Sequence, residues 1–154
     1  QSVGDVSTRM KEVIWSLNTE NDSLSNLINY LQKQARQMME HFPGKLTVSI
    51  PDTIPDMQIS GEARRHIYLA VKEALHNIIK HSGADKAELI ITCGDKLCIT
   101  VSDNGKGINS LENIPAGNGL KNMRSRIKQL NGNFFIKNKE GLTLTFEIPL
   151  QSNK

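Results

Sequence analysis

A chain of 154 residues is the size of a single domain. Its composition, with 38% hydrophobic and 23% charged residues, is that of a globular protein with one apolar core, which excludes a disordered chain. The net charge is only +3, and the sequence has no basic block, no long apolar run and no signal peptide, which argues against nucleic-acid binding, a lipid surface and a membrane span.

The first half of the chain predicts three helices and one strand. Apolar residues three and four positions apart predict a helix over 3–17 and a second helix over 22–41, capped by the aspartate at its start. Alternation of apolar and polar residues over 46–50 predicts a half-buried strand. A third amphipathic helix is predicted over 61–81, ended by Gly83.

A hairpin follows, with alternating apolar residues over 86–93 and 96–102. It holds both cysteines, Cys93 and Cys98, on either side of a Gly-Asp turn. Two cysteines are too few for a tetrahedral zinc site. We therefore interpret them as small apolar residues of a reduced, cytoplasmic protein.

The last third of the chain predicts a glycine- and asparagine-rich loop over 103–119 and a fourth helix over 120–130. A second hairpin is predicted from strands over 133–138 and 142–149. Helices combined with about five mainly antiparallel strands predict an α/β fold, a two-layer sandwich.

The first chemical motif lies on the third helix. Glu73 and Asn77 are four residues apart, so their side chains lie side by side, and a carboxylate with an amide oxygen suits Mg²⁺ completed by water and phosphate oxygens. Lys80 and His81 add positive charge one turn further on. The alternative interpretation is an ordinary solvated helix face.

The second motif, Asp103-Asn-Gly105-Lys-Gly107-Ile108, follows directly after a strand. A carboxylate at the end of a strand can accept a hydrogen bond from an exocyclic amine, and glycines let a ligand approach the backbone closely. The same residues are also typical of a plain turn.

The third motif, Gly117-Asn118-Gly119-Leu120, opens the fourth helix. Glycines before a helix N-terminus favour an anion site, because unpaired N–H groups and the helix dipole attract negative charge. A single Gly-x-Gly is weak evidence, and no Gly-Lys-Ser/Thr follows it to make a P-loop.

Taken together and in this order, the motifs resemble the N, G1 and G2 boxes of the Bergerat-fold ATPases, which include gyrase, heat-shock protein 90, MutL proteins and histidine kinases. The patterns Glu-x-x-x-Asn-x-x-Lys-His, Asp-x-Gly-x-Gly-Ile and Gly-x-Gly-Leu-x-Asn-Met-Arg-x-Arg resemble sensor histidine kinases of the DesK and NarX type. Residues 141–149 continue the resemblance, and residues 15–27 are similar to the entry into the kinase domain of Bacteroidetes-type sensor kinases.

The resemblance implies a Bergerat fold: a two-layer sandwich of a mixed, mostly antiparallel sheet and about three helices, preceded by a helical stub. Residues 1–20 would be the end of a dimerisation helix and a linker, residues 21–150 the ATP-binding catalytic domain, and residues 151–154 a tail.

The resemblance also implies a role for each motif. Asn77 would ligate Mg²⁺, and Glu73 would polarise the attacking imidazole or a water, or help order the metal shell. Asp103 would accept a hydrogen bond from the adenine amino group. The implied ATP-binding set is Asn77, Lys80, His81, Asp103, Gly105, Gly107, Ile108, Gly117, Asn118, Gly119 and Leu120.

The function implied is that of the ATP-binding catalytic domain of a two-component sensor histidine kinase. In such kinases an acidic residue follows the acceptor histidine, but the four histidines here precede Phe42, Ile67, Asn77 and Ser82. The acceptor is therefore expected upstream of this sequence. His66 shares the pocket-side arc of its helix, but we expect it to be a surface histidine.

The implied partners are ATP, a dimerisation domain of the same protein and, through it, a response regulator, with no nucleic acid. This stretch alone is expected to be monomeric or weakly dimeric, and the full-length protein a homodimer that is membrane-anchored, with this part in the cytoplasm. Two alternatives stay open: another Bergerat-fold ATPase or an anti-sigma type serine kinase, and a nucleotide-binding module without catalysis.

Overall fold

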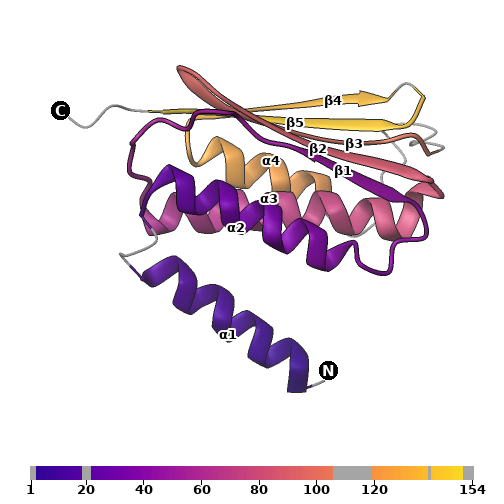
Figure 1. The fold of residues 1–154 in the computed structure, drawn as a ribbon, viewed down its shortest axis with the longest axis horizontal. Coiled ribbons are helices and arrows are strands. Elements are labelled where there is room, and N and C mark those ends of the chain that lie inside the picture. The colour runs from indigo at the N-terminus through magenta and orange to yellow at the C-terminus, as the bar shows by residue number, and fades with distance from the viewer. Residues whose placement is uncertain (1–2, 19–21, 106–118, 139, 151–154) are drawn as a thin grey trace.

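A five-stranded sheet with helices packed on one of its faces forms the body of the protein (Figure 1). The computed structural model describes residues 3–18, 22–105, 119–138 and 140–150. The strand order is β1-β2-β3-β5-β4, with β1 parallel to β2 and every other neighbouring pair antiparallel. The predicted α/β sandwich with a mixed, mostly antiparallel sheet is confirmed.

The bounds of the elements follow the predicted ranges closely. The helices are α1 (Val3–Leu17), α2 (Leu24–Met38), α3 (Gly61–Asn77) and α4 (Gly119–Lys128), and a π-helical turn, η2 (Ile78–Ser82), continues α3. The strands are β1 (Lys45–Ser49), β2 (Lys86–Cys93), β3 (Lys96–Asp103), β4 (Asn133–Asn138) and β5 (Leu142–Pro149).

The core lies between the sheet and the layer of α2, α3 and α4. Alternate residues of β2, β3 and β5 face it, and Leu89, Ile99 and Phe146 are fully buried there. Cys98 lies opposite Thr92 in the register of β2 and β3, whereas Cys93 lies opposite Leu97. The two cysteines therefore point to opposite faces of the sheet and are not joined by a disulfide.

Helix α1 packs against the side of the helical layer that faces away from the sheet (Figure 1). Trp15 stacks on Tyr30 of α2, with ring centroids 3.9 Å apart, and meets Tyr68 of α3 edge-on at 6.1 Å. Glu12 accepts hydrogen bonds from the Tyr68 hydroxyl at 2.6 Å and from Lys72 Nζ at 2.8 Å. An aromatic cluster and one shared carboxylate therefore fix α1 on α3.

A fully buried arginine, Arg64, completes this contact. Its guanidinium donates to the carbonyl oxygens at the C-terminal end of α1, where a helix lacks its own donors. The acceptors there are the carbonyls of Trp15 (3.3 Å), Ser16 (2.7 Å) and Asn18 (3.2 Å). Arg64 also pairs with the carboxylate of Asp22.

The Arg64–Asp22 pair changes how α2 begins. The predicted cap of this helix, Asp22, is wrong: its carboxylate binds Arg64, and the side chain of Ser23 caps α2 instead by accepting from the Asn26 N–H at 3.0 Å. Serine caps a helix about as well as aspartate, so the shift of the cap by one residue does not lower the stability of the helix.

The outer face of α1 stays exposed. Its apolar side chains at a spacing of three and four residues are Met10, Val13, Ile14 and Leu17. None of the helices among the described residues is long and apolar enough to cross a membrane.

Replacing Arg64 by Met is expected to lower the free energy of unfolding by about 3 kcal/mol or more. The change removes the charge that pairs with Asp22 and leaves the α1 carbonyl groups without donors, and breaking a buried pair from one side has a cost of this size. Urea unfolding measures the loss. The control is Arg36→Met on the exposed face of α2, expected to change stability by less than about 0.5 kcal/mol; equal losses in both variants would contradict the role of Arg64.

Candidate functional site

The first motif lies at the C-terminal end of α3. Glu73 and Asn77 lie in the last turns of the helix, and both are half-buried. The predicted helix does reach Ser82 and end at Gly83, but Ile78–Ser82 form the π-helical turn η2 instead of continuing the α-helix. Lys80 is exposed on this turn, which ends at Gly83 in a left-handed conformation with φ of 62°.

The π-helical turn places the positive residues of the motif differently from a continuous α-helix. A π-helical turn adds a residue to the helical turn, so Lys80 is rotated away from the position it would hold above Asn77. His81 belongs to the same turn. Such turns are frequent at functional sites.

The second motif begins at the end of β3, where Asp103 is half-buried. Its carboxylate accepts a hydrogen bond from the Gly105 N–H at 2.8 Å. Burial raises the pKa of Asp103, and hydrogen bonds from the backbone N–H groups of Gly105 and Leu142 oppose the shift. The unliganded chain therefore holds a carboxylate that is incompletely solvated.

The turn between β4 and β5 packs directly behind Asp103. Gly141 has φ of 109°, and a Cβ atom added there would lie 2.0 Å from the Asp103 carbonyl oxygen. Only glycine fits this position, because both its backbone angle and the close approach exclude a side chain. The turn thus fixes the backbone at the end of β3.

Asn104, the residue after Asp103, braces the loop that leads from η2 into β2. Its Oδ1 accepts from the backbone N–H groups of Asp85 at 3.1 Å and Lys86 at 3.0 Å. Its Nδ2 donates to the Asp85 carboxylate at 2.6 Å. Sequence reasoning gave Asn104 no role, because its partners Asp85 and Lys86 lie 19 and 18 residues away along the chain.

The third motif meets the first in space. Gly119 begins α4 beside Glu73, and a Cβ atom added at Gly119 would lie 3.1 Å from Glu73 Oε2. The Leu120 side chain is buried in the core, so only its backbone is available at the helix start. The Glu73 carboxylate thus lies against the N-terminus of α4, the end that the helix dipole makes positive.

A cavity of about 180 Å³ lies beside this contact. It is lined by Leu69, Lys72, Glu73, His76, Asn122, Met123 and Arg126. Burial lowers the pKa of His76, and the nearby charges of Lys72 and Lys80 lower it further. The carboxylates of Glu73 and Glu12 oppose this lowering of the His76 pKa.

Part of the predicted site lies outside the described residues: Gly107, Ile108, Gly117 and Asn118. Among the described residues, no three histidine, cysteine, aspartate or glutamate side chains converge on one point. The donors available for Mg²⁺ there are the hard oxygens of Asn77 and Glu73 on neighbouring turns of α3, a set that fits a metal whose other ligands are phosphates and waters.

The family of the chain is decided by sequence comparison. Residues 62–152 match the family described as histidine kinase-, DNA gyrase B-, and HSP90-like ATPases. The chain belongs to this family. Its members are ATPases, so ATP is the ligand that family membership implies.

Known relatives are similar to this chain in sequence, and solved structures are similar to it in fold. The sensor protein VraS of Staphylococcus aureus is 28% identical over 111 residues, which are 71% of this chain and 32% of VraS. The chain thus spans about a third of the length of this relative. The histidine kinase domain from the Erythrobacter litoralis EL346 blue-light activated histidine kinase shares the fold, with a TM-score of 0.64 and 24% identity over 80% of this chain and 61% of that chain. The catalytic domain of histidine kinase ThkA does so with a TM-score of 0.66 and 17% identity, over 85% and 96% of the two chains.

Several residues beside the site were missed by the sequence analysis. His66 is not a surface histidine, since only 13% of its side chain is exposed and its Nδ1 lies 3.4 Å from Arg126 Nη1. Burial lowers its pKa, as do the charges of Arg126 and Arg65, while Glu62 opposes them. The spacing of His66 on the pocket-side arc of α3 was the signal that could have identified it.

Replacing Asp103 by Asn is expected to stabilise the unliganded chain near pH 7. The pKa of Asp103 is higher in the folded than in the unfolded state, so wild-type stability falls as the pH rises from the ordinary aspartate pKa through the raised one. The variant lacks this loss, and the difference should vanish below roughly pH 3, where the carboxyl is neutral in both states.

Urea unfolding between pH 3 and pH 8 measures this difference. The control is Asp95→Asn, which removes the same charge in the exposed turn between β2 and β3. A variant at position 103 that is less stable than wild type near pH 7 would show that the charge of Asp103 is not the source of the pH dependence.

Proposed function

We propose that this chain is the ATP-binding catalytic domain of a two-component sensor histidine kinase of the DesK and NarX type. It transfers the γ-phosphoryl group of Mg-ATP to a histidine on a dimerisation domain of the same protein. The observation that carries the proposal is the contact between Glu73 and Gly119, because it joins a carboxylate on α3 to the anion-attracting start of α4. The relatives named as sensor protein and histidine kinases support it.

Asp103 selects the base of the nucleotide. A buried carboxylate accepts a hydrogen bond from the adenine amino group, whereas guanine presents a carbonyl at that position and would be repelled. The backbone N–H groups of Gly105 and Leu142 hold the carboxylate in place by hydrogen bonds. The half-buried carboxylate has lost part of its hydration. The hydrogen bond from the adenine amino group compensates for this loss, which favours the complex with ATP.

Asn77 and Glu73 have different roles at the phosphates. The Asn77 amide oxygen ligates Mg²⁺, which when bound neutralises part of the phosphate charge. Lys80 on the exposed turn η2 adds a cation for the phosphates, together with His81. Glu73 accepts a hydrogen bond from the attacking imidazole and orients it, so its contribution is to transfer and not to binding.

The start of α4 holds the phosphates from the other side. Gly119 lets the backbone approach, and the free N–H groups of the first turn attract negative charge. Gly117, Asn118, Gly107 and Ile108 complete the nucleotide site from the connecting segment.

Helix α1 supplies the link to the rest of the receptor. Its exposed apolar face, with Met10, Val13, Ile14 and Leu17 at helical spacing, is that of a helix from a dimerisation bundle. The proposed partners are therefore a second copy of the receptor and a response regulator, with a membrane anchor in the full-length protein and this domain in the cytoplasm.

Replacing Asp103 by Asn is expected to weaken ATP binding about tenfold to a hundredfold. A hydrogen bond to a charged group contributes roughly 1.5–3 kcal/mol, and the amide keeps the shape but loses the charge. Calorimetric titration with Mg-ATP measures the affinity, with Asp95→Asn as the matched control. Equal ATP affinities for wild type and Asp103→Asn would refute the adenine contact, as would a preference for GTP.

Replacing Asn77 by Ala is expected to remove the Mg²⁺-dependent part of ATP affinity, whereas Glu73→Gln should leave affinity within about threefold and lower transfer more than a hundredfold. Affinity is compared with and without EDTA. Transfer is followed as acid-labile label on a separately added dimerisation domain, since the chain alone should not label itself. If Glu73→Gln lowers affinity as much as Asn77→Ala does, the proposed division between metal binding and transfer is incorrect.

A further inference from the structure

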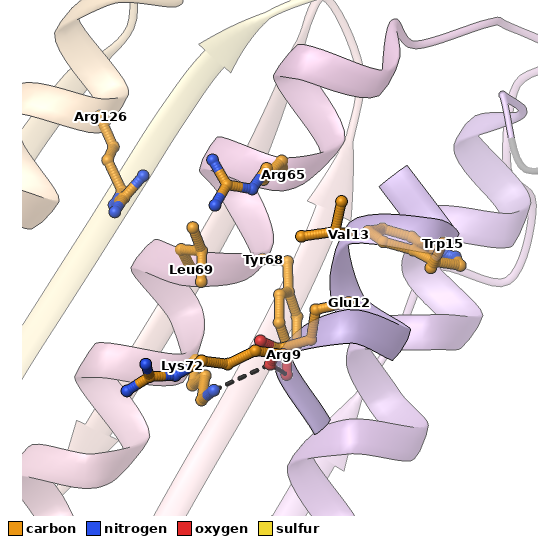
Figure 2. Close-up of a pocket in the computed structure, with 9 residues that line it drawn as sticks. All are labelled: Arg9, Glu12, Val13, Trp15, Arg65, Tyr68, Leu69, Lys72 and Arg126. Atoms are coloured by element: carbon orange, nitrogen blue, oxygen red, sulfur yellow. Dashed lines mark hydrogen bonds and ion pairs between the residues drawn. The ribbon is translucent and has the colours of Figure 1, made fainter. Parts of the chain in front are cut away.

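A second, larger cavity lies next to the first one, between α1, α3 and α4 (Figure 2). Its volume is about 360 Å³, the size of a small-ligand pocket. Four basic side chains line it: Arg9 from α1, Arg65 and Lys72 from α3, and Arg126 from α4. Basic residues from three separate helices therefore converge on one space.

The carboxylate in this cavity already has hydrogen-bond partners. Glu12 is the one carboxylate in its lining, and it is bound by the Tyr68 hydroxyl and by Lys72. Burial and the hydrogen bond to Glu12 raise the pKa of Tyr68, so its hydroxyl keeps the proton that it donates. Both hydrogen bonds end on the same carboxylate oxygen, Oε2, and the ion pair of Glu12 is with Lys72 and not with an arginine.

Arg65 and Arg126 face one another across the gap between α3 and α4 (Figure 2). Neither takes part in the four ion pairs found among the described residues. Burial lowers the pKa of Arg126, and the positive charge of Arg65 lowers it further, against the opposing charge of Glu73. Two guanidinium groups in repulsion gain stability when an anion binds between them.

The cavity is adjacent to the residue assigned to phosphoryl transfer. Leu69, Lys72 and Arg126 line both this cavity and the smaller one that contains Glu73. Helix α1, which we assign to the dimerisation domain, forms the opposite wall. An anion held here would thus lie between Glu73 and the domain that carries the acceptor.

We propose that Arg65 and Arg126 form a site for the phosphoryl group of phosphohistidine on the dimerisation domain. This rests on the proposed kinase function. A phosphoryl group is favoured over a carboxylate because its second negative charge matches two arginines, and each guanidinium can form paired hydrogen bonds with its oxygens. The site is separate from the nucleotide, which binds at Asp103 and Asn77.

The test measures binding directly on the intact chain. The probes are a short peptide carrying a phosphonate analogue of phosphohistidine, the same peptide with plain histidine, and inorganic phosphate. NMR signals of the arginine Nε–H groups report which residues respond. The variants are Arg65→Gln and Arg126→Gln, and the matched control is Arg124→Gln on the same helix, where the guanidinium stacks over Phe134 at 5.4 Å.

The phosphonate peptide is expected to shift the signals of Arg65 and Arg126 saturably and to leave Arg124 unchanged. Each of the two variants should weaken the peptide at least tenfold, whereas Arg124→Gln should not, and saturating Mg-ATP should not displace it. The shifts of the arginine signals in the wild-type spectra test the proposal even if a variant fails to fold.

Other outcomes would overturn the proposal. These are no shift, equal shifts at all arginines, binding of inorganic phosphate but not of the peptide, or displacement of the peptide by ATP. Peptide binding in a chain that does not bind ATP in calorimetry would leave the anion site standing and overturn the kinase assignment instead.

Discussion

The buried guanidinium of Arg64 is the interaction on which the arrangement of the helices depends. It satisfies the carbonyl end of α1 and the carboxylate of Asp22 at once, so one side chain fixes where α1 ends and where α2 begins. Gly61 allows this closeness, because a Cβ atom there would lie 2.1 Å from the Ser16 carbonyl oxygen. A charge buried in this way is stable only while all its partners are in place, so the contact is formed as a whole or not at all.

Helix α3 consequently serves two sites with different sides of the same helix. Tyr68 and Lys72 face α1 and hold Glu12, while Glu73 and Asn77 face the proposed nucleotide site. Successive residues of an α-helix are separated by about 100°, so neighbours in sequence can contact different elements. A displacement of α1 would therefore act on Lys72, the residue directly before the carboxylate that we assign to transfer.

The partial burial of the Asp103 carboxylate in the proposed nucleotide site lowers the stability of the fold. Asp103 loses solvation on folding, and the close packing of Gly141 behind it prevents the strand end from moving toward water. A group that lowers stability without ligand and gains a partner with ligand is typical of binding sites. Asn104 limits the cost by anchoring the adjacent loop, so that the burial of Asp103 does not loosen the surrounding backbone.

The sequence by itself determined the strands, the helices, the fold class and the order of the three motifs, because periodicity and turn residues act over a few positions. For the nucleotide site it predicts Glu73, Asn77 and Asp103, and this stays a prediction. It missed the roles of Arg64 and Asn104 and the closeness of Arg65 to Arg126 at one cavity. Those features join residues tens of positions apart, and no local pattern marks an arginine that will be buried. The cap at Ser23 and the π-helical turn after Asn77 were also decided by the tertiary structure. Ser23 and not Asp22 caps α2 because the Asp22 carboxylate pairs with the guanidinium of Arg64 on α3.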